Sequence, residues 1–278
     1  MLAVIAVTIL SACGKTIGIS ETALPKSDWP VIVAMTQQEI DVAASVTNPM
    51  VAGGGILGFI IASSIDNSKN KNAEAAIASI RDLLIEYKMA GRFYELMESS
   101  DVAALLSTNS IMETSMEHGR DYSANPLKQA QFIIIPRVEF SNDMSTLWVV
   151  LNVSGQVPNE KGKPGDKSFY GLYKYLYPLE EPPAGDDRVD YVAVWSELGK
   201  SKLIDIIEQG MISTIDLLKL NAANGSIPVT DTVVKIPNAA GVVPKLNLIS
   251  TNDGILWARN KNHESVMFAV PENLAKIK

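Results

Sequence analysis

Three runs of hydrophobic residues in the middle of the chain predict a central β-sheet. Residues 131–135 form a continuous run rich in β-branched and aromatic side chains, which is typical of a buried strand. Residues 147–153 and 169–177 follow as two further apolar runs, and polar turns separate all three. We therefore expect an antiparallel meander over residues 131–177.

Apolar residues spaced three to four positions apart predict two long amphipathic helices. The first pattern covers residues 73–88, with Gly91 as a stop signal. The second covers residues 189–221 and predicts a single helix of about 30 residues. A shorter helix is expected over residues 92–106.

The C-terminal part of the chain predicts a small β-meander. Residues 246–249 and 255–259 flank a polar turn that ends in Gly254, which predicts a hairpin, and residues 264–270 form the next strand. Shorter strands are expected at residues 31–34, 111–118 and 232–236.

Together these elements predict an α+β fold. A central antiparallel sheet is packed with two long helices and is followed by the small C-terminal β-meander. We expect the α+β domain to cover residues 31–225 and the meander, packed on it, to cover residues 226–278.

The first ten residues form an uncharged and almost wholly apolar run. As a helix this run spans only about 15 Å, half of the ~30 Å hydrocarbon core of a bilayer, so it is too short to cross a membrane. It has the length of the hydrophobic region of a signal peptide, although no Lys or Arg precedes it.

The residues that follow, Leu10-Ser11-Ala12-Cys13 and then Gly14, resemble the bacterial lipobox. The resemblance implies that residues 1–12 are a signal peptide, that Cys13 carries acyl chains, and that residues 13–30 are a tether. Because position 14 is not Asp, it also implies sorting to the periplasmic face of the outer membrane. Two or more acyl chains, at about 0.8 kcal/mol per buried CH₂, would anchor the protein stably. The alternative is a buried free cysteine in an ordinary apolar element.

The charge of the chain limits its partners. A formal net charge of −7 without a basic cluster argues against nucleic acid as a partner. It also offers little attraction to anionic headgroups, so membrane attachment would come from the lipid on Cys13. Since Cys13 is the only cysteine, the chain cannot form an internal disulfide.

An uncharged, glycine-rich run covers residues 50–65. As a helix it would be roughly 24 Å long, shorter than the ~30 Å hydrocarbon core. Gly54, Gly58 and Ala62 recur every four residues, which places small side chains on one helix face. Three interpretations stay open: a buried helix in close packing, a segment that contacts the outer leaflet beside the anchor, and self-association through the glycine face.

Two glycine motifs match nucleotide-binding sequences only in part. Gly53, Gly55 and Gly58 fit G-x-G-x-x-G, but turn-forming residues precede them where a dinucleotide fold needs a strand. Gly199 begins a Gly-Lys-Ser triplet, but Val194 stands where a phosphate-binding loop needs Gly. We expect no nucleotide and no cofactor.

A row of aromatic residues lies on one face of the third predicted strand: Phe169, Tyr173, Tyr175 and Tyr177. This row would suit a stacking surface for a glycan, a peptide or another flat ligand. The alternative is packing against neighbouring strands or a helix.

The sequence predicts no catalytic residue and no metal site. His118 and His263 are the only histidines, and one His per site cannot build a usual zinc centre. Ser68 and Lys71 fit S-x-x-K, but a lysine in a polar, exposed patch stays protonated and cannot act as a base. Paired carboxylates that the fold brings together would leave no trace in the sequence.

The order of these features resembles a broad set of proteobacterial outer-membrane lipoproteins without an assigned function. The shared features are the lipobox, a glycine-rich segment before a polar helix, an antiparallel sheet, and a Trp followed by a long helix. We expect a lipid-anchored binding or envelope-assembly factor with an envelope protein as partner and without catalysis. The alternative is a periplasmic hydrolase that acts on the cell wall or on glycans.

Overall fold

The centre of the protein is a three-stranded antiparallel meander, as the sequence predicted. It consists of β5 (Gln131–Phe140), β6 (Thr146–Gln156) and β7 (Phe169–Pro178). Phe140 lies opposite Leu147, and Gly155 lies opposite Phe169, so the three strands are paired along nearly their full length. The computed structural model describes residues 17–18, 28–34, 37, 39–42, 77–107, 112–115, 127–163, 165, 169–185, 187–224, 227–237, 239, 245–261 and 263–278.

The whole sheet is mixed rather than antiparallel, which corrects the prediction. On one side of the meander, β2 (Val31–Ala34) pairs in parallel with β5, and β4 (Met112–Ser115) pairs in parallel with β2. Farther along β5, β3 (Asp41–Val42) is parallel to it as well. A hydrophobic run identifies a strand but not its direction, and these strands are separated in sequence by long connections rather than tight turns.

The C-terminal meander belongs to the same sheet. It consists of β9 (Leu246–Asn252), β10 (Ile255–Asn260) and β11 (His263–Pro271). Because β11 pairs in parallel with β7, it joins the meander to the central strands in one 12-stranded sheet. Beyond β9 the sheet continues with β8 (Val233–Lys235) and ends at β12 (Lys276–Ile277), which pairs with β8.

The β9–β10 hairpin has the two-residue turn that its sequence favours. Asp253 and Gly254 both have positive φ, at 49° and 74°, as a type I′ turn requires. The predicted turn residues therefore do form the hairpin, and the strands extend closer to the turn than expected.

The first described residues of the chain already belong to the sheet. The short strand β1 (Ile17–Gly18) pairs in parallel with the first residues of β7. Of the segment 13–30 that was predicted to be a tether, the described residues are 17–18, which form β1, and 28–30. Cys13, Gly54, Gly58, Ala62 and His118 lie outside the described residues.

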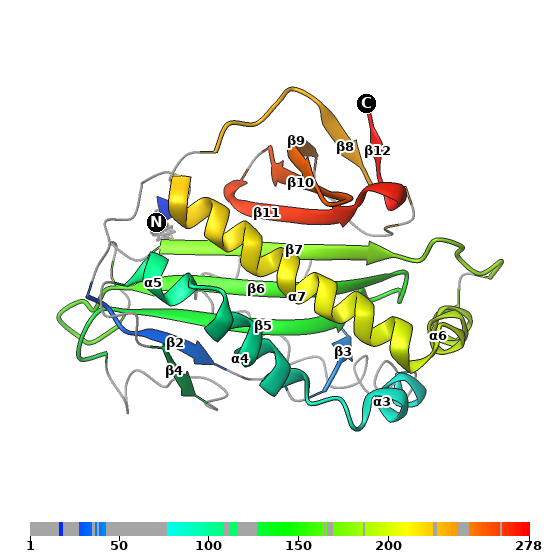
Figure 1. Ribbon diagram of the computed structural model, residues 1–278, viewed down its shortest axis with the longest axis horizontal. Helices are drawn as coiled ribbons and strands as arrows, with labels where there is room; N and C mark the ends of the chain where they lie inside the picture. Colours follow the sequence, from blue (N-terminus) through cyan, green and yellow to red (C-terminus); the bar gives the residue numbers. More distant parts are fainter. Residues whose placement is uncertain are drawn as a thin grey trace, which may run out of the picture.

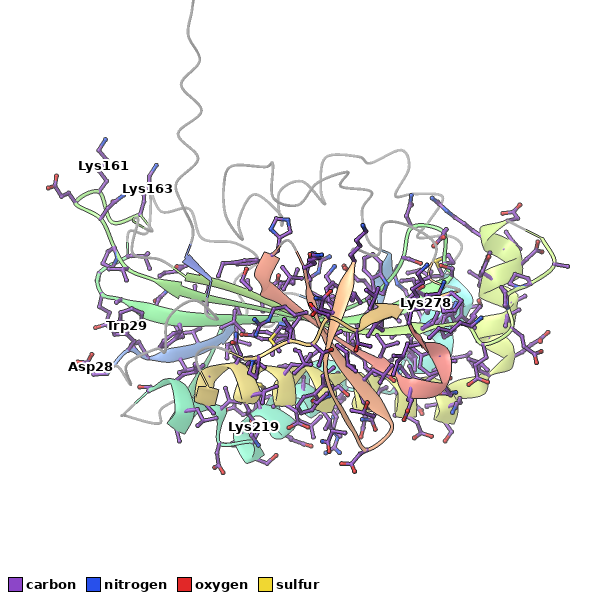
Figure 2. The ribbon with its side chains drawn as sticks, turned by 90° about the horizontal axis from the view of Figure 1, so that it is seen from above. Asp28, Trp29, Lys161, Lys163, Lys219 and Lys278 are labelled. Atoms are coloured by element: carbon purple, nitrogen blue, oxygen red, sulfur yellow. The ribbon has the colours of Figure 1, made fainter. Side chains whose placement is uncertain are left out.

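The described residues form five α-helices. The longest, α7 (Gly199–Asn224), runs along β6 and β7, and α6 (Arg188–Glu197) precedes it. The other three are α3 (Ala78–Leu84), α4 (Met89–Ser99) and α5 (Val102–Leu106). Of the five, α4, α5 and α7 lie on one side of the central strands and α6 stands beyond the end of β7 (Figures 1 and 2). None of the helices in the described part of the chain is long and apolar enough to cross a membrane.

Two predicted helices are interrupted. The expected helix over residues 189–221 divides at Leu198 into α6 and α7, and Gly199 adopts a φ of 77° there. The expected helix over residues 92–106 divides at Asp101, whose φ is 58°. Hydrophobic spacing continues across both breaks, because the two pieces of each pair bury residues in the same core.

The main core lies between the helices and the sheet. Its largest buried side chains include Trp195, Phe93, Phe132 and Phe140. Arg92 of α4 forms a two-pronged ion pair with Glu208 of α7, with N–O distances of 3.0 and 3.1 Å, and so links two helices. A second, smaller core forms on the other side of the sheet around Leu246, Leu256 and Phe268.

Candidate functional site on the helix-free face of the sheet

The predicted aromatic row faces the helices rather than a ligand. Tyr173, Tyr175 and Tyr177 are 0%, 1% and 8% exposed and belong to the main core. The side chain of Phe169 lies outside the described part of the structure. The interpretation of this row as a stacking surface is therefore corrected, and the alternative of packing against a helix applies to the three tyrosines.

Two of the three buried tyrosines have a specific partner in the helical layer or the adjoining loop. The Tyr173 hydroxyl accepts a 2.8 Å hydrogen bond from the Asn221 amide of α7. The Tyr177 ring packs against Trp195 at 6.2 Å between centroids, and its hydroxyl donates to Glu180. Burial raises the pKa of all three hydroxyls, that of Tyr177 to about 12.

The opposite face of the same strands carries a group of charged and aromatic side chains. Successive residues of a strand alternate between faces, so residues between the tyrosines point away from the helices. Lys174 of β7 lies in register with Val150 of β6, and Val150 lies in register with Arg137 of β5. Glu139, two residues after Arg137 and on the same face of β5, lies opposite Trp148 of β6. We call Arg137, Glu139, Trp148 and Lys174 the charged cluster.

Close contacts join the members of the charged cluster. Arg137 Nη2 lies 3.3 Å from Glu139 Oε2, and the two side chains are only 11% and 3% exposed. Lys174 Nζ lies 4.5 Å from the centroid of the Trp148 ring, a cation–π distance. A salt bridge and a cation–π pair therefore share one partly buried patch at the middle of the sheet.

The electrostatics of this patch centre on the carboxylate of Glu139. Burial lowers the pKa of Lys174, the carboxylate of Glu139 opposes that effect, and the nearby charge of Arg137 adds to it. Glu139 thus interacts with two cations at once.

A row of polar side chains extends from the charged cluster toward the start of β7. The Tyr170 hydroxyl donates a 3.1 Å hydrogen bond to Asn152 Oδ1, and burial raises the pKa of Tyr170. Ser154 and Gln131 are also buried on this face. The amide nitrogen of Gln131 has no hydrogen-bond acceptor among the described residues. The face can therefore engage polar as well as charged groups.

The charged cluster was not predicted from the sequence, although a signal was present. Arg137, Glu139 and Lys174 are the only charged residues within β5, β6 and β7. Their positions in the strands have the parity that places all three on one face. Charged residues inside strands that are otherwise apolar on both faces were the signal that could have located the site.

Other described features suit a chemical site less well. No group of three or more His, Cys, Asp or Glu side chains in the described residues is placed to hold a metal ion. His263 lies at the start of β11, opposite Asn260. A cleft of about 280 Å³ lies beyond the end of β7, where Glu180, Asn273 and Lys276 are among its lining residues. A cavity of about 10 Å³, large enough for one water molecule, lies beside Pro136 and Arg137.

Comparison with known proteins does not add to this description. No family model, no curated protein and no solved structure matches the chain.

Proposed function

We propose that this protein is a lipid-anchored binding or envelope-assembly factor on the periplasmic face of the outer membrane. Acyl chains on Cys13 hold it at the membrane, and the charged cluster binds a segment of an envelope protein that carries an acidic group. Binding, rather than the conversion of a substrate, is its function.

The charged cluster is the observation that carries this proposal. Two cations, Arg137 and Lys174, are held beside one carboxylate on rigid strands, and Trp148 supplies a flat apolar surface. A carboxylate from a partner would form charge-assisted hydrogen bonds with these cations, and Trp and Arg are enriched where partners bind tightly. The lipobox residues support the location, since acylation would keep the domain in the envelope.

The membrane anchor is tested with Cys13→Ala. We expect the parent protein to incorporate labelled palmitate and to fractionate with the outer membrane, and we expect the variant to do neither. A Cys13→Ala protein that stays membrane-bound after a high-salt wash would show that the anchor lies elsewhere in the chain.

Binding through the charged cluster is tested by site-specific photo-crosslinking. A benzoylphenylalanine at Leu172, two residues from Lys174 on the same face, should give a defined adduct in intact envelopes. The same group at Ile212, an exposed position of α7 on the helical side, serves as the control. Lys174→Met should abolish the adduct at position 172, and Lys174→Arg, which keeps the charge, should preserve most of it. Equal adducts from both positions, or an adduct that survives Lys174→Met, would contradict the proposal.

A further inference from the structure

The pairing of β1 determines which end of the sheet lies nearest to Cys13. Ile17 lies opposite Phe169 and Gly18 lies opposite Tyr170, and the two strands are parallel. Ile17 therefore lies at the end of the sheet where β7 begins. Cys13 is four positions before Ile17, and four residues can reach at most about 14 Å. An anchor on Cys13 would hold this end of the sheet close to the membrane.

The same end carries exposed lysines on a well-defined loop. Lys161 and Lys163 lie in the connection between β6 and β7 and project from that end of the molecule (Figure 2). The side chain of Asn159 accepts hydrogen bonds from the backbone nitrogens of both lysines, at 2.9 and 3.1 Å. The Gly162 carbonyl accepts a 2.8 Å bond from the nitrogen of Leu127, which places exposed Lys128 beside the loop.

Charge is distributed unevenly along the strands. At the end near β1, which we call the basic end, exposed Lys128, Lys161 and Lys163 lie with the exposed acids Asp28 and Glu160. At the opposite end, the acidic end, the segment after β7 exposes four carboxylates and lies near Arg188 and Lys276. These carboxylates belong to Glu180, Glu181, Asp187 and Asp190.

The distance between the two ends is several times the Debye length, so salt screens the electrostatic interaction between them. The ten residues of β7 span about 35 Å. The Debye length at physiological ionic strength is about 8 Å. A membrane that touches the basic end therefore attracts its lysines, while repulsion from the acidic end is screened.

We propose that the basic end rests on anionic phospholipid headgroups of the membrane that holds Cys13, and that the acidic end points away from it. This inference rests on the proposed lipid anchor. The strands then stand roughly upright on the membrane, and the charged cluster lies partway along them, where it can meet a partner that is itself embedded in or attached to the envelope.

The orientation is tested by energy transfer from the protein to the membrane. The lipidated protein is labelled with a donor at Glu160→Cys or at Glu181→Cys and reconstituted into phosphatidylcholine vesicles with phosphatidylglycerol and a rhodamine-labelled lipid. We expect several-fold stronger quenching of the donor at position 160 than at position 181. Lys161→Glu with Lys163→Glu should reduce this difference, as should about 1 M NaCl, where the Debye length falls to about 3 Å.

Two controls separate the failure of this inference from the failure of the anchor. Lys202→Glu with Lys276→Glu makes the same charge change at exposed positions away from the basic end and should leave the quenching difference intact. If the protein floats with the vesicles but both donors are quenched equally, the orientation is wrong while the anchor stands. If the protein does not float with the vesicles, the lipid anchor fails and this inference fails with it.

Discussion

The indole nitrogen of Trp195 donates a 2.7 Å hydrogen bond to the backbone carbonyl of Met144. This bond connects α6 to the tight turn between β5 and β6. Met144 has a φ of 66°, an unfavourable value for a side chain of this size, and Trp195 is fully buried. The helix thus supplies the hydrogen bond that the turn carbonyl needs, and the Trp195 ring covers Phe140 at 5.0 Å between centroids.

Replacing Trp195 with Phe should destabilise the protein by about 2–4 kcal/mol. The change leaves the Met144 carbonyl buried without its donor and creates a cavity beside Phe140. Urea unfolding followed by circular dichroism measures the loss. Trp257→Phe is the matched control, because Trp257 is only partly buried, and its effect should be clearly smaller. Equal losses in the two variants would show that the bond to Met144 contributes little.

The contact between α7 and the sheet depends on the absence of a side chain at Gly210. A Cβ atom there would lie 2.5 Å from Val149 Cγ2 and 2.8 Å from Tyr175 Cδ1, far inside van der Waals contact. We expect Gly210→Ala to destabilise the protein by about 1–3 kcal/mol through overpacking, although alanine favours a helix by about 1 kcal/mol. Thermal or urea unfolding measures the difference.

For Gly91→Ala, in the same helical layer, we expect the opposite effect on stability. Gly91 lies in α4, and the nearest atom to its added Cβ would be Lys88 Cβ at 3.9 Å, an ordinary contact. The substitution should stabilise the protein by about 0.5–1 kcal/mol. If both glycine variants change the stability of the protein in the same direction, close packing around Gly210 does not explain the effect of Gly210→Ala.

The buried pair of Tyr173 and Asn221 should show strong coupling. Tyr173→Phe removes the acceptor of the Asn221 amide, and Asn221→Leu removes the donor, so each should cost about 1–3 kcal/mol. The double variant leaves neither polar group without its partner. We expect it to be at least about 1 kcal/mol more stable than the sum of the single changes predicts. Additive losses in a double-mutant cycle would contradict this.

Stability should fall in strongly alkaline solution because of the buried tyrosines. The pKa of the Tyr177 hydroxyl rises from 10.0 to about 12, and the pKa values of Tyr170, Tyr173 and Tyr175 also rise because of burial. A pKa that is higher in the folded state means that the neutral hydroxyl stabilises the fold fully below pH 10. This contribution is lost as the pH rises through 10 toward 12. Lys174, whose pKa is lowered by burial, has the opposite effect, since deprotonation relieves the cost of its burial.

Spectroscopic titration checks the alkaline prediction. The phenolate absorbance of the buried tyrosines should appear together with the loss of circular dichroism, in one cooperative step above pH 10. Phenolate absorbance near pH 10 from these residues in a protein that keeps its native circular dichroism would contradict their burial. Phe replacements at Tyr173 and Tyr175 identify their share of the signal.

Strands and helices could be predicted from the sequence where apolar residues recur at regular spacing. The runs at 131–135, 147–153 and 169–177 lie within β5, β6 and β7 in the expected antiparallel order. The five-residue connection between β5 and β6 leaves little choice of direction. The helix breaks at Leu198 and Asp101 were not predicted. Each depends on a local backbone conformation that hydrophobic spacing does not encode.

The sequence by itself determined the α+β class, the three central strands, the hairpin at Asp253–Gly254 and the lipobox hypothesis at Cys13. It could not decide which face of β7 meets a helix, because apolar residues occupy both faces of that strand. Only the tertiary structure placed Tyr173 and Tyr175 under α7 and gathered Arg137, Glu139 and Lys174 on the other face. The parallel pairings of β1, β2 and β11 were also decided there, because long connections allow either direction and packing of the whole sheet selects one.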